Sequence, residues 1–272
     1  MYSTVVIQRI IIGKTMSQVI MVGCRKGGVG KTTVAINIAY ELSMLGKQVL
    51  LLDLDSQGDS TKYTGRLDEE FFIGDVLLDR NFDITKAIYP AIIAGQESKN
   101  LHVIAGRDGD AMTKLDMEMI SLARREERLS IHLKAIQDKY DYVIIDTSPG
   151  TNVLGLNAVL AADSFLIPTE FKDHSLDGVA TLLAHIEDVK FIDESEINFL
   201  VVPSKISKSS TDALTYGKAY LDASWPDNQA KTIIYERAVV VKAESAHEPV
   251  SVFAPNHVAA SFYKSLALEL TQ

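Results

Sequence analysis

The stretch Arg25-Lys26-Gly27-Gly28-Val29-Gly30-Lys31-Thr32-Thr33 decides the fold of this 272-residue chain. It follows a short apolar run at 19–23, which predicts a strand, and it precedes a helix-like segment at 34–45. A strand, a glycine-rich turn and a helix N-terminus in this order bring backbone N–H groups and the positive end of a helix dipole together. We therefore expect the turn to bind phosphate groups.

Two side chains at the end of the turn complete the expected phosphate site. Lys31 can reach the β- and γ-phosphates of a nucleotide, and the Thr32 hydroxyl is placed to bind Mg²⁺. The residues expected to contact the nucleotide here are Gly27, Gly28, Val29, Gly30, Lys31, Thr32 and Thr33.

Composition limits the class of protein. With 47% hydrophobic residues the chain can bury a full core, and we expect one domain over residues 16–272 after an N-terminal extension at 1–15. The net charge of -9 argues against binding nucleic acid through overall charge, although a local basic patch is compatible with it. The single cysteine, Cys24, excludes a disulfide framework and fits a reducing cytoplasm. No apolar run reaches the roughly 20 residues of a membrane span, so we expect a soluble protein.

Apolar runs alternate with amphipathic segments along the chain. This pattern is typical of an α/β fold in which helices cover both faces of a buried, mostly parallel, twisted sheet. The expected strands are 19–23, 49–55, 101–105, 142–146, 165–168, 199–202 and 232–235, and the expected helices are 34–45, 115–139, 176–189, 211–222 and 258–270. Between residues 60 and 100 we expect helices and loops beside the nucleotide.

Two of the expected strands end in aspartate. The strand at 142–146 ends at Asp146, which would place a carboxylate beside Thr32, where it can hold Mg²⁺ or its water ligands. The strand at 49–55 ends in Asp53 and Asp55. We assign Asp146 to the metal site.

The turn departs from the general P-loop pattern G-x-x-x-x-G-K-[ST], because Arg25 stands where that pattern has glycine. With Lys26 before the two glycines it resembles instead the deviant Walker A box, K-G-G-x-G-K-[ST], of the ParA/MinD family of ATPases. The resemblance covers residues 18–270 and extends to the segment after Asp53, which is similar to the family's D-x-D-P-Q-G-N. Ser56 and Asp59 depart from that segment.

The resemblance implies a P-loop NTPase fold, ATP and Mg²⁺ as cofactors, and ATP hydrolysis. Asp55 would bind near Mg²⁺ and activate the attacking water, and Lys31 would contact the phosphates. Lys26 would cross to the partner's nucleotide in an ATP-sandwich homodimer, acting like a trans arginine finger; the alternative is a solvated loop lysine. The adenine would lie near Pro203, Ser204 and Lys205.

The resemblance is strongest to partition ATPases of the short type. Such a protein would be cytoplasmic and nucleoid-associated, would bind nonspecific DNA as a dimer, and would position a plasmid, chromosome region or other cargo with a ParB-like partner that stimulates hydrolysis. The candidate DNA contacts are Lys205, Lys208, Lys218, Lys231, Arg237 and Lys242.

Two other functions stay open at this point. A MinD-like membrane ATPase would need a basic amphipathic C-terminal helix, but only Lys264 is basic in the segment 258–270, so we expect that segment to pack on the core and expect no membrane partner. A small-molecule ATP-dependent ligase on the same fold is the other alternative.

Overall fold

The sheet at the centre of the molecule is mostly parallel. The computed structural model describes residues 10–11, 14–208 and 210–272. Within them, seven strands form one sheet in the order β5-β6-β4-β7-β3-β8-β9, and only the pairing of β5 with β6 is antiparallel. Their bounds are β3 Gln18–Val22, β4 Val49–Leu54, β5 Tyr89–Ile93, β6 Gln96–Ile104, β7 Tyr142–Thr147, β8 Ser164–Thr169 and β9 Phe199–Pro203. Two short strands, β1 Ile10–Ile11 and β2 Lys14–Thr15, pair with each other outside this sheet.

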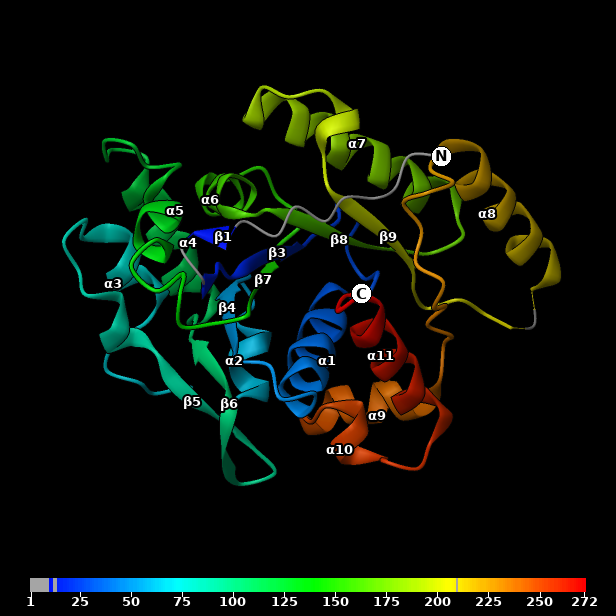
Figure 1. The fold of residues 1–272 in the computed structure, drawn as a ribbon, viewed down its shortest axis with the longest axis horizontal. Coiled ribbons are helices and arrows are strands. Elements are labelled where there is room, and N and C mark those ends of the chain that lie inside the picture. The colour runs from blue at the N-terminus through cyan, green and yellow to red at the C-terminus, as the bar shows by residue number, and fades with distance from the viewer. Residues whose placement is uncertain (1–9, 12–13, 209) are drawn as a thin grey trace.

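Helices cover both faces of the sheet. In Figure 1, α6 and α7 lie on one side of it, and α1 and α11 lie on the other. The helices are α1 Lys31–Met44, α2 Asp59–Tyr63, α3 Ile73–Leu78, α4 Gly109–Met119, α5 Arg128–Leu133, α6 Val153–Ala161, α7 Asp173–Lys190, α8 Thr211–Ser224, α9 Ala238–Ala246, α10 Val250–Phe253 and α11 Val258–Glu269. Short 3-10 turns occupy Ile84–Ala87 and Glu194–Glu196. The predicted α/β fold is confirmed.

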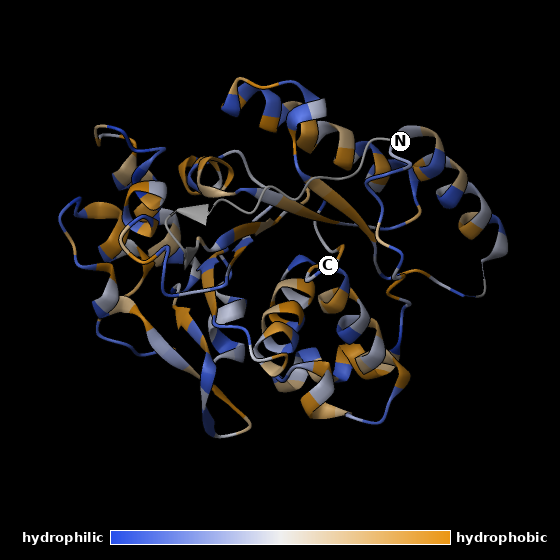
Figure 2. Cartoon of the chain, in the orientation of Figure 1, coloured by the Kyte–Doolittle hydropathy of each residue, from blue (hydrophilic) through white to orange (hydrophobic). Residues whose placement is uncertain are grey.

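The apolar side chains of the strands point alternately into two cores. Val19 and Met21 of β3 belong to the core under α6 and α7, and Ile20 and Val22 belong to the core under α1 and α11. Successive strand residues face opposite sides of a sheet, so a strand that is apolar throughout must be covered on both faces. Figure 2 shows the apolar residues concentrated along the strands and on the sides of the helices that face them.

The predicted helix at 115–139 is wrong as a single element. The structure divides this region into α4, which ends at Met119, and α5, which begins at Arg128, and Arg124 between them has a left-handed backbone with φ 52°. The backbone carbonyl of Arg125 then accepts a hydrogen bond of 2.7 Å from the Asn157 side chain of α6. This tertiary contact outweighs the helix propensity of the segment.

The predicted strand at 232–235 is also wrong. This segment forms only an isolated bridge, between Ile206 and Tyr235, and it does not extend the sheet beyond β9. The segment 228–234 contacts the edge of β9 through single hydrogen bonds, such as those from Ala230 N–H to Val201 and from Ile234 N–H to Pro203, and these do not form a continuous ladder. Between residues 60 and 100 the expected helices are present, but β5 and most of β6 were not predicted.

Candidate active site

The glycine-rich turn joins β3 to α1 at the carboxyl end of the sheet. Gly30 precedes the first residue of α1 and has φ 90°, a conformation that side-chain-bearing residues rarely adopt. Val29 is fully buried and anchors the turn, whereas Gly27 and Gly28 are exposed. No side chain of the described residues caps the start of α1, so its first N–H groups remain available to an anion.

Lys31 begins α1 and is buried, with 7% of its surface exposed. The loop after β9 approaches the turn from the other side. A Cβ atom added at Gly30 would lie 3.3 Å from Oγ of Ser204 and 3.4 Å from Cε of Lys205. The structure therefore places Ser204 and Lys205 beside the phosphate-binding turn, directly after Pro203 at the end of β9.

Three strand ends meet at the turn. Val22 of β3 and Asp53 of β4 both pair with Asp146 of β7, so the carboxylates of Asp53 and Asp146 lie on neighbouring strands next to the turn. Both side chains have no exposed surface.

Asp146 has one carboxylate oxygen with a partner and one without. Ser60 of α2 donates a hydrogen bond of 2.6 Å to Oδ2, and Oδ1 is buried with no hydrogen-bond partner among the described residues. Burial and then the nearby charge of Asp53 raise the pKa of Asp146 to about 8, although hydrogen bonds from Ser60 and Thr32 act in the opposite direction. An unpartnered buried carboxylate oxygen beside a threonine hydroxyl fits a divalent cation.

The donor set suits Mg²⁺ in particular. Among the described residues no group of three or more His, Cys, Asp and Glu side chains is arranged to hold a metal ion. Mg²⁺ does not need such a group, because it keeps several waters and takes one or two protein ligands together with phosphate oxygens. Thr32, at the start of α1, and Asp146, at the end of β7, would supply ligands of this kind.

Asp53 and Asp55 have different surroundings although they are two residues apart. Oδ2 of Asp53 accepts hydrogen bonds from the hydroxyl of Thr61 at 2.6 Å and from its backbone N–H at 2.8 Å. Burial raises the pKa of Asp53 to about 6. Both contacts tie α2 to β4, which gives Asp53 a structural role.

Asp55 lies in the loop after β4 and keeps 8% of its surface exposed. Its Oδ1 accepts a hydrogen bond of 3.0 Å from the backbone N–H of Gln57, which orients the carboxylate. Of the two carboxylates, Asp55 is the one that a water molecule near the phosphates could reach.

Lys26 lies in the exposed part of the turn. Its side chain is exposed and makes no ion pair or side-chain hydrogen bond with another described residue. Its backbone packs against α7, where a Cβ added at Gly178 would lie 3.6 Å from Cβ of Lys26. A fixed backbone with an exposed ammonium group leaves Lys26 able to contact a molecule outside this protomer.

Sequence reasoning missed Ser60 and Thr61. These residues open the short helix α2 and connect it to Asp146 and Asp53. The only signal was their place five and six residues after Asp55, and serine and threonine are common in loops and turns of many kinds.

The candidate DNA contacts do not form one continuous group. The ammonium of Lys208 lies 4.5 Å from the centre of the Tyr235 ring, and the guanidinium carbon of Arg237 lies 5.9 Å from it. Lys205 is close by, one residue before Ile206, which bridges to Tyr235.

The other three basic residues are more separate. Lys242 is exposed on α9, and Lys218 on α8 forms an ion pair of 3.1 Å with Asp222. Lys231 is exposed near the end of α11, where its backbone N–H donates to Glu269.

The C-terminal helix packs on the core, as predicted. Tyr263 and Leu266 of α11 are buried in the same core as α1. Among the residues that the structure describes, no helix is both long and apolar enough to cross a membrane.

Comparison with known proteins finds relatives that match most of the chain. A family model described as an AAA domain matches residues 17–199. The chain is 31% identical over 261 residues to the sporulation initiation inhibitor protein Soj of Bacillus subtilis, covering 94% of this chain and 98% of the relative. It is 30% identical over 247 residues to the chromosome-partitioning ATPase Soj of Thermus thermophilus, covering 90% of this chain and 92% of the relative.

Its fold is similar to that of the cell division ATPase MinD of Pyrococcus furiosus, with a TM-score of 0.74 at 21% identity, covering 94% of this chain and 99% of the other. The family model and the sequence relatives show that the chain belongs to the ParA/MinD family of P-loop ATPases, and the fold and the phosphate-binding turn agree with this.

Proposed function

We propose that this ATPase dimerises on ATP, binds nonspecific DNA as the dimer, and positions a cargo with a ParB-like partner that stimulates hydrolysis. The observation that carries the proposal is the exposed, unpaired side chain of Lys26 beside a phosphate-binding turn whose own lysine, Lys31, is already buried in place. A second lysine is not needed to bind phosphate within one protomer. Its position suits contact with the nucleotide of a second copy.

The hydrolysis step follows from the site residues. Lys31 and the N–H groups of the turn hold the phosphates, Thr32 and Asp146 would hold Mg²⁺, and Asp55 orients the attacking water. When bound, Mg²⁺ neutralises negative charge on the phosphate oxygens. Lys26 of the second copy adds positive charge where it develops on the transferred phosphoryl group. In GTPases a residue with that role contributes about 10³ to 10⁵ in rate.

Pro203 and Lys205 would contact the base or the phosphates from the loop after β9. This part of the proposal is supported by the proximity of Ser204 and Lys205 to Gly30. Contact of Lys205 with the nucleotide would also remove it from the set of residues that can bind DNA.

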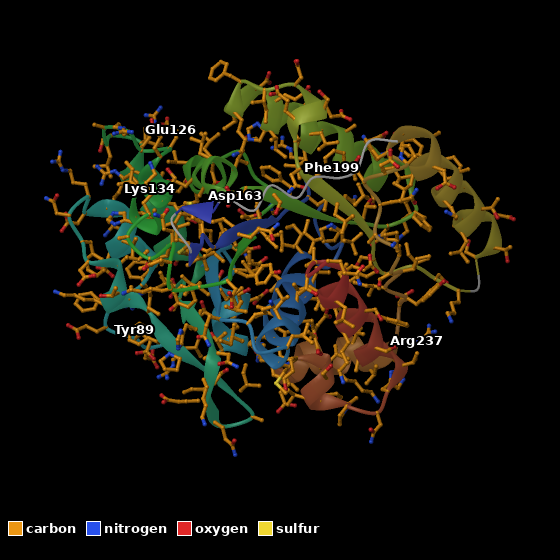
Figure 3. All side chains as sticks on the ribbon, viewed as in Figure 1. Tyr89, Glu126, Lys134, Asp163, Phe199 and Arg237 are labelled. Atoms are coloured by element: carbon orange, nitrogen blue, oxygen red, sulfur yellow. The ribbon has the colours of Figure 1, made fainter. Side chains whose placement is uncertain are left out.

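The proposed DNA surface centres on Tyr235, where Lys208 and Arg237 lie close together. In Figure 3, Arg237 lies on the side of the molecule formed by α9 and α11, far from Lys134, which directly follows α5. A dimer doubles such a surface, and contacts with phosphates make binding steeply dependent on salt. The relationship to a chromosome-partitioning ATPase supports the DNA role.

An electrophoretic shift of nonspecific duplex DNA tests this function. The wild-type protein should shift DNA with ATP and Mg²⁺ at low salt, less at raised salt, and not with ADP. Arg237→Ala should weaken binding, whereas Lys134→Ala, an exposed lysine on the opposite side, should not. Absence of an ATP-dependent shift at either salt concentration would contradict the DNA role.

A further inference from the structure

Helix α1 carries a buried polar stripe. Thr33, Asn37 and Glu41 are spaced four residues apart, so they lie on one face of the helix. Their exposed fractions are 8%, 1% and 4%, and most of their neighbours in α1 are apolar and buried. Buried polar side chains need partners, because an unsatisfied group destabilises the folded state.

The partners of the stripe lie in α9 and α10. The hydroxyl of Thr33 donates to Oε1 of Glu244, and the hydroxyl of Ser251 donates to Oε1 of Glu41. Between them, Oδ1 of Asn37 accepts a hydrogen bond of 2.7 Å from the backbone N–H of Val250. The helix that begins at the phosphate-binding turn is thus connected at three successive turns to the segment 244–251.

A second connection joins α9 to the carboxylate side of the site. The rings of Tyr63 in α2 and His247 at the end of α9 meet edge to face, with their centroids 5.6 Å apart. The same short helix holds Ser60, which donates to Asp146. Besides burial, the charge of Glu244 raises the pKa of Tyr63, which places Glu244 near α2 as well as α1.

Glu244 therefore lies where two elements beside the phosphate-binding turn converge. One is the N-terminus of α1, where Thr33 is adjacent to Thr32. The other is α2, whose Ser60 donates a hydrogen bond to Asp146. The opposite end of α9 begins after Arg237.

We propose that Glu244 is a positioning residue that couples α9 to the nucleotide state of the phosphate-binding turn. When nucleotide orders Thr32 and Thr33, the hydroxyl of Thr33 is held toward Glu244 and the last turn of α9 is held with it. Without nucleotide this connection opens more readily. The inference rests on nucleotide binding and does not depend on DNA binding.

Hydrogen–deuterium exchange of residues 238–249 tests the coupling, with and without a non-hydrolysable ATP analogue and Mg²⁺. In the wild type, nucleotide should slow exchange in α9 by about tenfold, the size expected for a hydrogen bond to a charged group. Glu244→Ala should bind the analogue but lose this slowing, and Glu244→Gln should keep most of it, because the amide oxygen can accept from Thr33.

Ser245→Ala is the matched control. Its hydroxyl is exposed and donates only to Val241 within α9, so the variant should behave as the wild type. The proposal is overturned if nucleotide leaves the exchange of α9 unchanged in the wild type, or if Glu244→Ala speeds exchange equally with and without nucleotide. If Glu244→Ala does not fold, the exchange of α9 in the wild type with and without nucleotide decides the question by itself. Loss of DNA binding with an intact response of α9 would contradict the DNA role only.

Discussion

The hydroxyl of Ser60 lies 2.6 Å from Oδ2 of Asp146 and donates a hydrogen bond to it, while Oδ1 of the same carboxylate is buried without a partner. A side chain that orients a metal ligand in this way typically contributes 10- to 100-fold, as an order of magnitude, to metal affinity or activity. In the proposed Mg²⁺ site Asp146 would therefore have a direct role and Ser60 a supporting one.

Ser60→Ala should therefore weaken Mg²⁺-dependent ATP hydrolysis by about 10-fold, and Asp146→Asn should weaken it more. Titration of activity with Mg²⁺ measures both, and the loss in Ser60→Ala should be partly recovered at high Mg²⁺. Ser121→Ala, which removes a hydroxyl that donates only to Glu118 on α4, is the control. Equal Mg²⁺ dependence in Ser60→Ala and the wild type would contradict the role of Ser60.

Substitutions of Asp53 and Asp55 should have different effects, one on stability and the other on catalysis. Asp55→Asn is expected to lower turnover by about 10² to 10⁴, because it removes the group that orients water, and to leave the unfolding free energy nearly unchanged. Asp53→Asn should instead lower stability, since the Thr61 contacts are buried. Urea unfolding together with single-turnover hydrolysis measures both quantities. A fully active Asp55→Asn variant would show that another group activates the water.

Thr61 is expected to matter for stability. Its hydroxyl donates to Asp53 and accepts from the backbone N–H of Gly106 at 2.8 Å, so Thr61→Val removes two buried hydrogen bonds and leaves the N–H of Gly106 without this partner. The expected loss is about 1 to 3 kcal/mol of unfolding free energy in urea. Thr215→Val, on the exposed face of α8, should change it by less than about 0.5 kcal/mol. A loss no greater than that of the control would contradict the assignment.

The central sheet and the nucleotide site could be predicted because they depend on local patterns. Apolar strands that are covered on both faces differ clearly from amphipathic helices, and the glycine-rich turn has few alternative structures. The break at Arg124 could not be predicted, since it depends on Asn157 in a distant helix. Ser60 was missed for the same reason: its partner, Asp146, is 86 residues away in sequence.

Glu41 should make stability depend on pH. Burial raises its pKa above the ordinary value of 4.5, although the Ser251 hydrogen bond and the charge of Lys264 act in the opposite direction. The folded state therefore holds the proton more tightly than the unfolded state, and this residue's contribution to stability falls as pH rises above about 4.5.

Glu41→Gln keeps an acceptor for Ser251 and removes the ionisation. Its melting temperature relative to the wild type should increase between pH 4 and pH 7. Thermal unfolding at a series of pH values measures this difference, with Glu118→Gln on the exposed face of α4 as the control. A difference that is constant or falls with pH would contradict the argument.

The most direct test of the account is the oligomeric state of Lys26→Ala with ATP and Mg²⁺, measured by light scattering after size-exclusion chromatography, together with its rate of hydrolysis. The wild type should be a dimer with ATP and a monomer with ADP. Lys26→Ala should still bind ATP through Lys31 but remain a monomer and hydrolyse ATP much more slowly. An ATP-dependent dimer with wild-type turnover in Lys26→Ala would contradict the account.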